Sequence, residues 1–523
     1  MKIKAALIVD NLSIAEWQRQ ALEEIRDLVD VTLVLSCRNT KTKKRFAKHF
    51  LYYAVNVLWL RSAFTRMVPL EPASAQVVSF DSDYEGMWQR LPADVVEQIR
   101  RQDIRLVIKF GMSLLRVGTD IEDLDILSYH HGDPEHYRGR PAGFYEIADY
   151  ADKVGIIVQK ISNTLDGGEI LARGHSKIYH HSYRRTAANF YANSRYLLRK
   201  AILNYQDGKR IEIRKLGTNY RLPSNSLVAL FLVKLAGRTL SRLAYGAFWE
   251  KKWNIVTFKM DGIPANSPLS VAKGKVPDIG PRYSFYADPF FSMDGKKIRV
   301  EALNAKNGLG EIIEVDVEAM NTESVLLKGS HYSYPYSFKD GDTEYILPEV
   351  AGHSAPFVLQ HPFVNESRHV LEGLADLRLV DPSLVKHEGY YYLFSGHADS
   401  VADCLHLYVS KELKGPYSPH PHSPIVIDPE CARMGGRLSR VGEKMYRFGQ
   451  NNCFGYGDRI TVSEIIELTP TRYEERKVGH IAFDDARGPH TLDLHNGSAV
   501  LDFYIDRFSL MAGYRRLAAK VFD

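Results

Sequence analysis

Residues 128–139 read SYHHGDPEHYRG and residues 165–168 read LDGG, and these two stretches decide the fold of the first part of the chain. An apolar run over residues 106–108 precedes them and predicts a buried parallel strand. In open α/β sheets, ligands bind at the loops that leave the carboxyl ends of such strands. A histidine on one loop and an aspartate on a later glycine-rich loop can therefore meet as a base and its orienting partner.

The two stretches resemble the signature of the formyltransferases that use 10-formyltetrahydrofolate, a group that includes the methionyl-tRNA, glycinamide ribonucleotide and sugar-amine N-formyltransferases. That signature is Asn-x-His, six residues, aromatic-Arg-Gly, and later Leu-Asp-x-Gly. The match puts the family histidine at His130 and the family aspartate at Asp166, 36 residues further on. Ser128 occupies the position of the family asparagine. The resemblance implies a formyltransferase domain over residues 1–204.

The resemblance also implies roles for single residues. His130 would stabilise the oxyanion and move protons, Asp166 would hold its imidazole in one tautomer, and Ser128 would stand beside them. The folate co-substrate would be held by Met112, Ser113, Leu115 and Leu165. Arg138 is predicted either to anchor a substrate phosphate or carboxylate or to fix its loop through an ion pair. His131 is a second candidate for substrate binding. No metal is expected.

The composition limits the protein class. A chain of 523 residues predicts about two or three domains. Hydrophobic and charged shares of 45% and 25% are those of an ordinary soluble protein, and a net charge of +5 does not require a nucleic-acid partner. The four cysteines form no Cys-x-x-Cys pair, so neither a disulfide framework nor a zinc site is indicated. The first residues predict a β-strand rather than a signal peptide, so a cytoplasmic location is expected.

The start of the chain alternates between strand and helix patterns. Residues 5–9 and 31–35 predict strands, with helical spacing over residues 14–28 between them, which favours a doubly wound, Rossmann-like sheet. No Gly-x-Gly-x-x-Gly follows the first strand, so a nicotinamide cofactor is not expected. A basic run over residues 41–48 indicates either a solvated face or a region that attracts a phosphate-bearing substrate.

Residues 205–250 are predicted to be a helical linker. Lys234, Arg238 and Arg242 recur every four residues in an otherwise apolar helix over residues 226–248, and they would form one basic stripe. The apolar stretch is too short to span a bilayer. The helix either lies on an anionic membrane surface, at the inner membrane face, with Phe248 and Trp249 as anchors, or packs between two domains with a solvated basic edge.

From residue 251 onward, short strands and turns repeat. The turn residues Gly295, Gly341, Gly389, Gly442 and Gly497 lie 46, 48, 53 and 55 residues apart. Xaa-Gly hairpins at this period predict a five-bladed β-propeller over residues 251–523. Equivalent positions of successive blades should face one central pocket, which would be lined by Asp288, Glu301, Tyr334, Glu349, Asp381, Gln450 and His490. Carboxylates that share a pocket raise one another's pKa values.

The second half resembles the five-bladed glycosidase-like propellers, in particular the N-terminal domain of plant glucosamine inositolphosphorylceramide transferases. The residues that carry the resemblance include Ala287-Asp288-Pro289, Ser333-Tyr334-Pro335, Pro348-Glu349, Asp381-Pro382, Gln450 and Tyr456-Gly457. The resemblance implies a carbohydrate ligand. It leaves open whether the propeller is a hydrolase or transferase, or a module that binds or presents a glycan.

Taken together, the sequence predicts an N-formyltransferase that moves a formyl group from 10-formyltetrahydrofolate to the amino group of a nucleotide- or lipid-linked sugar, in glycan biosynthesis of the cell envelope. The propeller favours a sugar over transfer RNA, because the second half has no dense basic stripe with interleaved aromatic residues. Two alternatives stay open: a glycan-binding protein with an inactive formyltransferase half, and a glycosidase or glycosyltransferase centred on Asp288 and Asp381.

Overall fold

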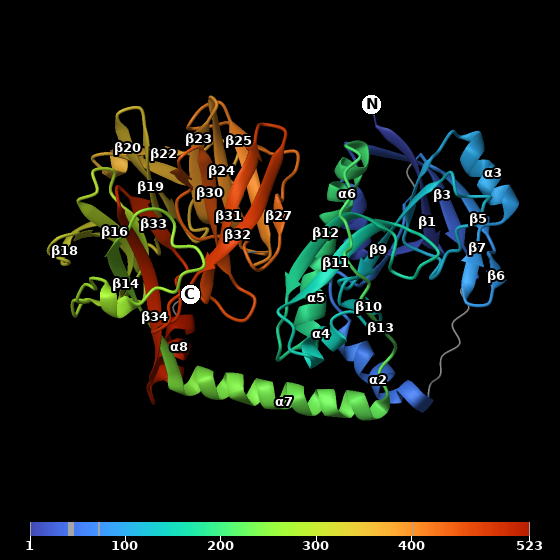
Figure 1. Cartoon of the computed structure of the whole chain (residues 1–523), viewed down its shortest axis with the longest axis horizontal. Helices are drawn as coiled ribbons and strands as arrows, with labels where there is room; N and C mark the ends of the chain where they lie inside the picture. Colours follow the sequence, from blue (N-terminus) through green and yellow to red (C-terminus); the bar gives the residue numbers. More distant parts are fainter. Residues whose placement is uncertain (1, 40–46, 72–73, 401, 522–523) are drawn as a thin grey trace. The chain divides into compact units, whose positions relative to one another are not determined.

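A computed structural model describes residues 2–39, 47–71, 74–400 and 402–521 of the chain, with the side chains of the last helix described up to residue 516. The chain divides into two compact units, Met1–Leu240 and Ser241–Asp523 (Figure 1). Most of the basic run predicted over residues 41–48 lies outside the described residues.

Unit one combines strands with helices. Its strands are β1 (Ile3–Asp10), β2 (Ser13–Ala15), β3 (Val29–Cys37), β4 (Met67–Pro69), β5 (Gln76–Phe80), β6 (Asp83–Glu85), β7 (Trp88–Arg90), β8 (Leu106–Lys109), β9 (Asp125–His131), β10 (Tyr137–Gly139), β11 (Lys153–Lys160), β12 (Glu169–Lys177) and β13 (Thr218–Tyr220). Its helices are α1 (Glu16–Glu23), the 3-10 turn η1 (Ala47–His49), α2 (Phe50–Trp59), α3 (Ala93–Arg101), α4 (Phe144–Ala148), α5 (Tyr183–Ser194) and α6 (Leu197–Gln206); α7 (Asn225–Phe248) starts in unit one and ends in unit two.

The main sheet of unit one is mixed. In its described part, nine strands form one sheet in which β12, β11, β9, β8 and β1 are successive neighbours, and β3 and β5 continue beyond β1. Strands β1, β3, β5, β8 and β9 pair in parallel, whereas β11 is antiparallel to both β9 and β12. The predicted α/β class is confirmed. Strand β12 runs antiparallel to β11 because the loop between them, residues 161–168, is too short for a parallel crossover.

The apolar strands of this sheet hold the candidate site in place. Leu106, Val107 and Ile108 of β8 are buried, and Val95 and Ile99 of α3 pack into the same core. The buried run ends at Lys109, beside the carboxyl end of β9. The site residues of β8 and β9 therefore lie at the edge where sequence reasoning predicts a ligand.

The domain boundaries differ from those predicted. Residues 205–240 belong to unit one rather than to a separate linker, and β13 pairs in parallel with β10, within the signature loop. The propeller begins at Trp249, because β14 (Trp249–Lys259) pairs along its whole length with the last strand, β34 (Ser498–Phe508). Sequence periodicity could not reveal either contact, since both join segments that are distant in the chain.

The predicted helix over residues 226–248 is present as α7, and two of its basic residues contact unit one. Arg238 Nη1 donates to the carbonyl of Ile147 at 2.8 Å, its guanidinium lies 4.9 Å from the ring centroid of Tyr150, and Lys234 Nζ donates to the carbonyl of Ala148 at 3.4 Å. Cations suit this position because the carbonyls at the end of α4 lack partners in the helix. These contacts fit the alternative in which the helix packs against the protein, and contact with an anionic membrane surface stays a prediction.

Unit two is a five-bladed β-propeller. The blades of its described part are β15 (Tyr283–Phe291) to β18 (Thr322–Leu327) with β16 (Lys297–Asn304) and β17 (Gly310–Asp316); β19 (Ser333–Asp340), β20 (Thr343–Glu349), β21 (Phe357–Gln360) and β22 (Arg368–Val370); β23 (Leu379–His387), β24 (Tyr390–His397), β25 (Cys404–Ser410), β26 (Ser418–Pro419) and β27 (Val426–Ile427); β28 (Arg433–Met434), β29 (Ser439–Val441), β30 (Lys444–Asn451), β31 (Arg459–Leu468) and β32 (Tyr473–Ile481); and β33 (Leu492–His495) with β34 and β14. Short helices are η2 (Val271–Lys273), η3 (Asn365–Ser367) and α8 (Ala512–Val521).

The ring closes with strands from both ends of the unit. Strand β14, which comes first in the unit, lies beside β34, which comes last (Figure 1). The five predicted turn glycines all have positive φ, between 58° and 80°, and each lies in the hairpin between two successive strands of a blade. Glycine adopts this conformation without steric cost, so the repeat found in the sequence is the repeat of the hairpins.

Candidate functional site

The histidine and the aspartate of the signature meet. His130 Nδ1 lies 3.2 Å from Asp166 Oδ1, and Asp166 Oδ2 accepts the backbone N–H of Gly139 at 2.9 Å. His130 is 9% exposed, and its Nε2 has no hydrogen-bond partner among the described residues. A contact at Nδ1 leaves Nε2 as the nitrogen that can exchange a proton with a ligand.

Gly132 lies against this buried nitrogen, and Arg138 holds the loops in place. A Cβ at Gly132 would lie 2.7 Å from His130 Nε2, so glycine leaves space there. Arg138 Nε donates to the carbonyl of Gly217 at 3.0 Å, and Nη1 donates to the carbonyl of Leu165 at 3.2 Å. Arg138 therefore ties the signature loop to the Asp166 loop. These contacts favour the loop-fixing alternative, although they are made to carbonyls rather than to an anionic side chain.

Lys109 is a member of this site that sequence reasoning missed. It is the cross-strand partner of Ser128, so the two side chains share a face of the sheet with His130. Lys109 is buried, and burial lowers the pKa of its ammonium to about 8. The negative charges of Asp10 and Asp166 raise this pKa, but their effect is smaller than that of burial. Its Nζ donates to the carbonyl of Ser113 at 3.4 Å. The available signal was a lysine directly after an apolar strand.

The structure places His131 away from His130. Successive residues of a strand point to opposite faces, and the His131 ring packs 5.3 Å from Trp17 and 4.9 Å from Tyr191, between ring centroids. Its Nε2 lies 2.9 Å from Ser194 Oγ. Burial, and then the neighbouring His130, lowers the pKa of His131 to about 3. The predicted role in substrate binding does not fit a neutral ring packed beneath α5.

The predicted folate-contacting residues fall into two groups. Met112 and Leu115 are buried in the core of unit one, and the Met112 N–H donates to Asp10 Oδ1 at 3.0 Å. Their side chains are therefore not offered to a ligand. Ser113 is exposed, and Leu165 is partly exposed beside Asp166. Only these two of the four predicted residues present side chains at the surface near His130.

In unit two, inner strands of successive blades carry a bulge at the same place. Asp288, Tyr334 and Asp381 have φ values of 50°, 46° and 48°, and the strand register shifts at each of them. A residue in the left-handed region followed by proline is rare, and a bulge turns its side chain away from the normal alternation. The sequence signal was the Xaa-Pro dipeptide that follows the same spacing in three blades.

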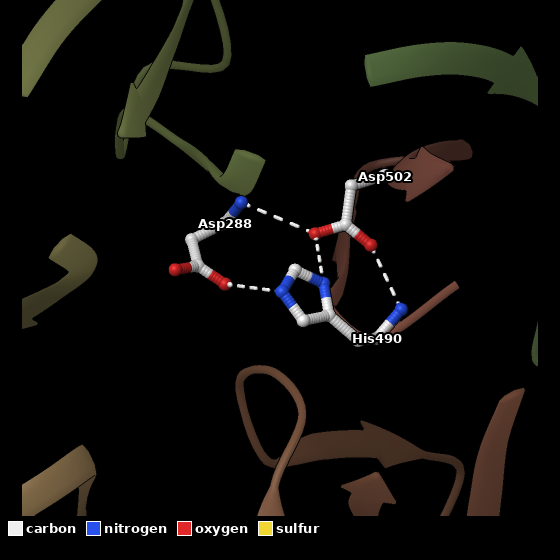
Figure 2. Close-up of side chains that lie close together, drawn as sticks. All are labelled: Asp288, His490 and Asp502. Carbon is white, nitrogen blue, oxygen red and sulfur yellow. Dashed lines mark hydrogen bonds and ion pairs between the residues drawn. The ribbon is translucent and has the colours of Figure 1, made fainter. Parts of the chain in front are cut away.

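One of these positions, Asp288, belongs to a buried cluster around one histidine. Asp502 Oδ1 accepts the N–H of His490 at 2.8 Å, and its Oδ2 accepts the N–H of Asp288 at 3.1 Å and contacts His490 Nδ1 (Figure 2). Asp502 Oδ1 also accepts the N–H of Thr491 at 3.0 Å. His490 Nε2 lies 3.6 Å from Asp288 Oδ1 (Figure 2). Burial alone would lower the pKa of His490, but Asp502 and Asp288 raise it above its ordinary value.

The same three residues have the donor set of a cation site. Their ligand atoms lie within 4.8 Å of one another. Both oxygens of Asp502, however, already accept backbone N–H groups, and one of them contacts His490 Nδ1. Hydrogen bonds inside the protein thus occupy the positions that an ion would need, and the expectation of no metal stays a prediction.

A second group surrounds Asp381. Arg433 Nε donates to Asp381 Oδ2 at 2.5 Å and Gln450 Nε2 donates to the same oxygen at 2.8 Å, while the Asp381 N–H donates to Glu349 Oε2 at 2.9 Å. Arg433 was not predicted, and no spacing rule would have selected it. It is the cation that pairs with the buried Asp381 carboxylate.

Glu301 and Glu349 have no arginine or lysine within ion-pair distance among the described residues, and Asp288 faces only His490. Burial, followed by repulsion from Asp381, raises the pKa of Glu349 to about 8. Burial raises the pKa of Glu301 well above its ordinary value, and charge repulsion from three neighbouring carboxylates, Asp288, Glu349 and Asp381, adds to this effect. Burial also raises the pKa of Asp288 to about 6. These groups lie close enough to affect one another's pKa values, and the shared pocket stays a prediction.

Tyr334 and two further aromatic residues contact members of these two groups. The Tyr334 hydroxyl lies 3.0 Å from Ser383 Oγ and accepts the N–H of Gly436 at 2.9 Å, so it joins inner strands rather than facing a ligand. Trp253 stacks on His490 at 4.3 Å between ring centroids, and the Arg433 guanidinium lies 5.0 Å from the centroid of Tyr456. Tyr456 is 40% exposed. Trp253 was missed because it lies on β14, outside the internal repeat.

Comparison with known sequences places the second half near one family. Residues 251–500 match the family described as glucosamine inositolphosphorylceramide transferase 1, N-terminal. The chain is 27% identical over 218 residues to glucosamine inositolphosphorylceramide transferase 1 of Oryza sativa subsp. japonica, covering 39% of this chain and 29% of that protein. The Arabidopsis thaliana protein of the same name is 26% identical over 208 residues, covering 37% and 27%. The chain thus spans less than a third of these curated relatives.

Similar solved structures include proteins that resemble either half. A formyltetrahydrofolate deformylase from Pseudomonas putida is 17% identical, with a TM-score of 0.29, covering 42% of this chain and 71% of that chain. A glycinamide ribonucleotide transformylase from Symbiobacterium toebii is 16% identical, with a TM-score of 0.29, covering 42% and 95%. An exo-β-1,3-galactanase from Phanerochaete chrysosporium is 14% identical, with a TM-score of 0.25, covering 35% and 48%.

Proposed function

We propose that this protein transfers the formyl group of 10-formyltetrahydrofolate to the amino group of a sugar. The observation that carries the proposal is the buried His130, held by Asp166 at Nδ1 and without a partner at Nε2 among the described residues. The similarity of residues 251–500 to part of a glycan transferase supports a sugar as the acceptor. The experiment is incubation of the full chain with 10-formyltetrahydrofolate and amino-sugar nucleotides, with the N-formyl product measured by mass spectrometry.

The reaction joins the acceptor nitrogen to the formyl carbon and breaks the bond between that carbon and N10 of the folate. One proton leaves the acceptor nitrogen and one arrives at N10, so a single group that exchanges protons can serve both steps. His130 Nε2 takes this role, and Asp166 holds the ring. Negative charge develops on the formyl oxygen and needs a donor that is already in position.

Lys109 supplies that donor in the place where the resembled family has asparagine. It stands beside Ser128 on the same face of the sheet, and its ammonium carries three N–H donors at the end of a long side chain. The side chain of Ser128, which is shorter than asparagine, then needs only to leave room for the Lys109 ammonium. This assignment accounts for a buried lysine near His130 that the core of unit one does not require.

Replacing Lys109 by methionine is expected to lower kcat by about 10²–10³-fold, which is the usual effect of losing one oxyanion donor. Because the protonated form is the donor and its pKa lies near 8, the rate of the unmodified protein should fall as the pH rises through about 8. The Lys109→Met variant should lack this alkaline limb. The measurement is a pH profile of kcat for both proteins.

Lys215→Met, at an exposed position of the same unit, is the matched control and should leave kcat unchanged. Adding Ser128→Asn to Lys109→Met should restore part of the rate, because an amide donor then returns to the strand position. Full activity of Lys109→Met at every pH would exclude the assigned role.

A second candidate function is glycosyl transfer or hydrolysis in the propeller. The raised pKa of Glu349, about 8, favours it, since a general acid must remain protonated near neutral pH. Loss of glycan turnover in Asp288→Asn, with no loss in His130→Ala, would support this function over formyl transfer. Glycan binding without any turnover would instead support the alternative of a binding protein with an inactive first unit.

Peripheral membrane contact through residues 226–249 remains a proposal for the location of a lipid-linked substrate, on the cytoplasmic side of the inner membrane. No helix of the described residues is long and apolar enough to cross a membrane. Leu230 and Val233 of α7 are 53% and 69% exposed, and Val57 and Leu58 of the neighbouring α2 are 52% and 69% exposed. Trp59 and Phe231, 5.9 Å apart between ring centroids, join the two helices.

Val233→Glu is expected to reduce the fraction of protein that sediments with vesicles by about tenfold, because each buried apolar side chain contributes about 1.5–3 kcal/mol. Since Lys234 and Arg238 face the protein, neutral and anionic vesicles should bind about equally well. Val441→Glu, at an exposed turn of unit two, is the control. Unchanged sedimentation of Val233→Glu would rule out contact through this face.

A further inference from the structure

The axial cluster of unit two, defined as Asp288, Glu301, Glu349, Asp381, Arg433, Gln450, His490 and Asp502, has fewer cations than carboxyl groups. Arg433 neutralises Asp381, and His490 lies between Asp288 and Asp502. Glu301 has only His331 Nε2, at 3.8 Å, as a cationic neighbour within ion-pair distance among the described residues. Glu349 has no such neighbour in the described part of the chain, and it accepts only the N–H of Asp381. Two carboxyl groups are thus left without a strong cationic partner.

A buried amide oxygen without a donor also indicates a ligand at the axial cluster. Gln450 is fully buried, and its amide points into the cluster because Nε2 donates to Asp381 Oδ2 at 2.8 Å. Its Oε1 has no donor among the described residues. A buried acceptor without a donor is costly, so this oxygen indicates a ligand that donates hydrogen bonds.

We propose that the axial cluster binds the ammonium group of an amino sugar. An ammonium group has three donors, no acceptor and one positive charge. Glu301, Glu349 and Gln450 offer acceptors, and the first two also lack a full countercharge. A neutral sugar could donate hydrogen bonds but could not offset the excess of carboxyl groups. The acceptor set and the charge therefore select an amine over a hydroxyl group.

Two aromatic residues beside the axial cluster, Tyr456 and Trp253, suit a sugar ring attached to that amine. Tyr456 is partly exposed, and its ring covers Arg433, while Trp253 covers His490 on the β14 side. Flat aromatic faces offer apolar area for the apolar face of a sugar ring. That the amine is carried by a sugar rests on the proposed function, whereas the preference for a cation rests on the cluster alone.

Binding of a cation should also release protons. Glu301, Glu349 and Asp288 hold protons more tightly than usual because burial and neighbouring carboxylates raise their pKa values. A bound ammonium favours the ionised carboxylates and lowers those pKa values. Protons then pass to the buffer, and a neutral sugar would not cause this release.

The test is calorimetric titration of the full chain with D-glucosamine, N-acetyl-D-glucosamine and D-glucose at pH 7, without folate. Glucosamine is expected to bind at least about tenfold more tightly than the two neutral sugars, as expected for a charged hydrogen-bond donor. Its heat should vary between buffers of different ionisation enthalpy, which reports the released protons. Glu301→Gln and Glu349→Gln should each weaken glucosamine about tenfold.

Asp342→Asn, at a fully exposed carboxylate of unit two, is the control and should bind like the unmodified protein. His130→Ala should also bind glucosamine normally, so failure of formyl transfer and failure of this site can be told apart. Equal binding of glucosamine and glucose, or no binding of any of the three, would overturn the proposal. Binding of calcium chloride without binding of glucosamine would assign the cluster to a metal ion instead and would equally overturn it.

Discussion

His130→Ala is expected to lower kcat for formyl transfer by about 10²–10⁴-fold, the usual contribution of a positioned acid–base group. The imidazole is the buried group of unit one whose Nδ1 is fixed by Asp166 and whose Nε2 is unpartnered among the described residues. Alanine removes both the proton acceptor and the proton donor. KM for the sugar should change little, because the propeller is remote in sequence and has its own binding groups. Product formation would be followed by mass spectrometry at saturating folate.

Asp166→Asn tests whether the orientation and tautomer of the His130 ring matter, while the imidazole itself stays in place. The asparagine is of equal size, but it can present its amide N–H to His130 Nδ1 and thereby favour the wrong tautomer, so a loss comparable to that of His130→Ala is expected. The matched control is His136→Ala, since His136 pairs with Asp133 on the exposed part of the same loop. Equal activity of His130→Ala and the unmodified protein would exclude formyl transfer at this site.

The second large effect concerns stability. Arg447 is 0% exposed, and its Nε and Nη2 donate to the two oxygens of Glu475 at 2.7 and 2.6 Å. Arg447→Met leaves a buried carboxylate without its cation and is expected to cost about 3–5 kcal/mol. For a unit of this size, that corresponds to a fall of about 6–15 °C in the Tm of the propeller transition. Scanning calorimetry of the full chain measures it.

The double variant Arg447→Met/Glu475→Leu tests the cause. It removes both charges, so most of the lost stability should return. Arg101→Met breaks the exposed pair with Glu97 and should change stability by less than about 1 kcal/mol. If the double variant were as unstable as Arg447→Met, then lost packing rather than the isolated carboxylate would explain the loss.

Sequence reasoning found the parts of this protein that repeat or that match a loop signature. The turn glycines from Gly295 to Gly497 defined the blades, because positive φ makes glycine necessary at each hairpin. His130 and Asp166 were identified from loop content and then found in contact. Such features are local in the chain, so the order of residues alone can reveal them.

The residues that were missed act through contacts between distant segments. Lys109 belongs to the site because β8 pairs with β9, and Arg433 because β28 brings it to Asp381. Trp253 reaches His490 only after β14 has joined the last blade. The orientation of α7 could not be chosen for the same reason, since helical spacing groups Lys234 with Arg238 but does not say which side meets the protein.

The pairing of β14 with β34 has a consequence during synthesis on the ribosome. The two strands are separated by about 240 residues, which take on the order of 10–50 s to translate at the usual rate. For that time the earlier strand is an unpaired edge that can associate with other nascent chains. Its charged residues, Glu250, Lys251 and Lys252, are of the kind that discourages such association until the partner strand emerges.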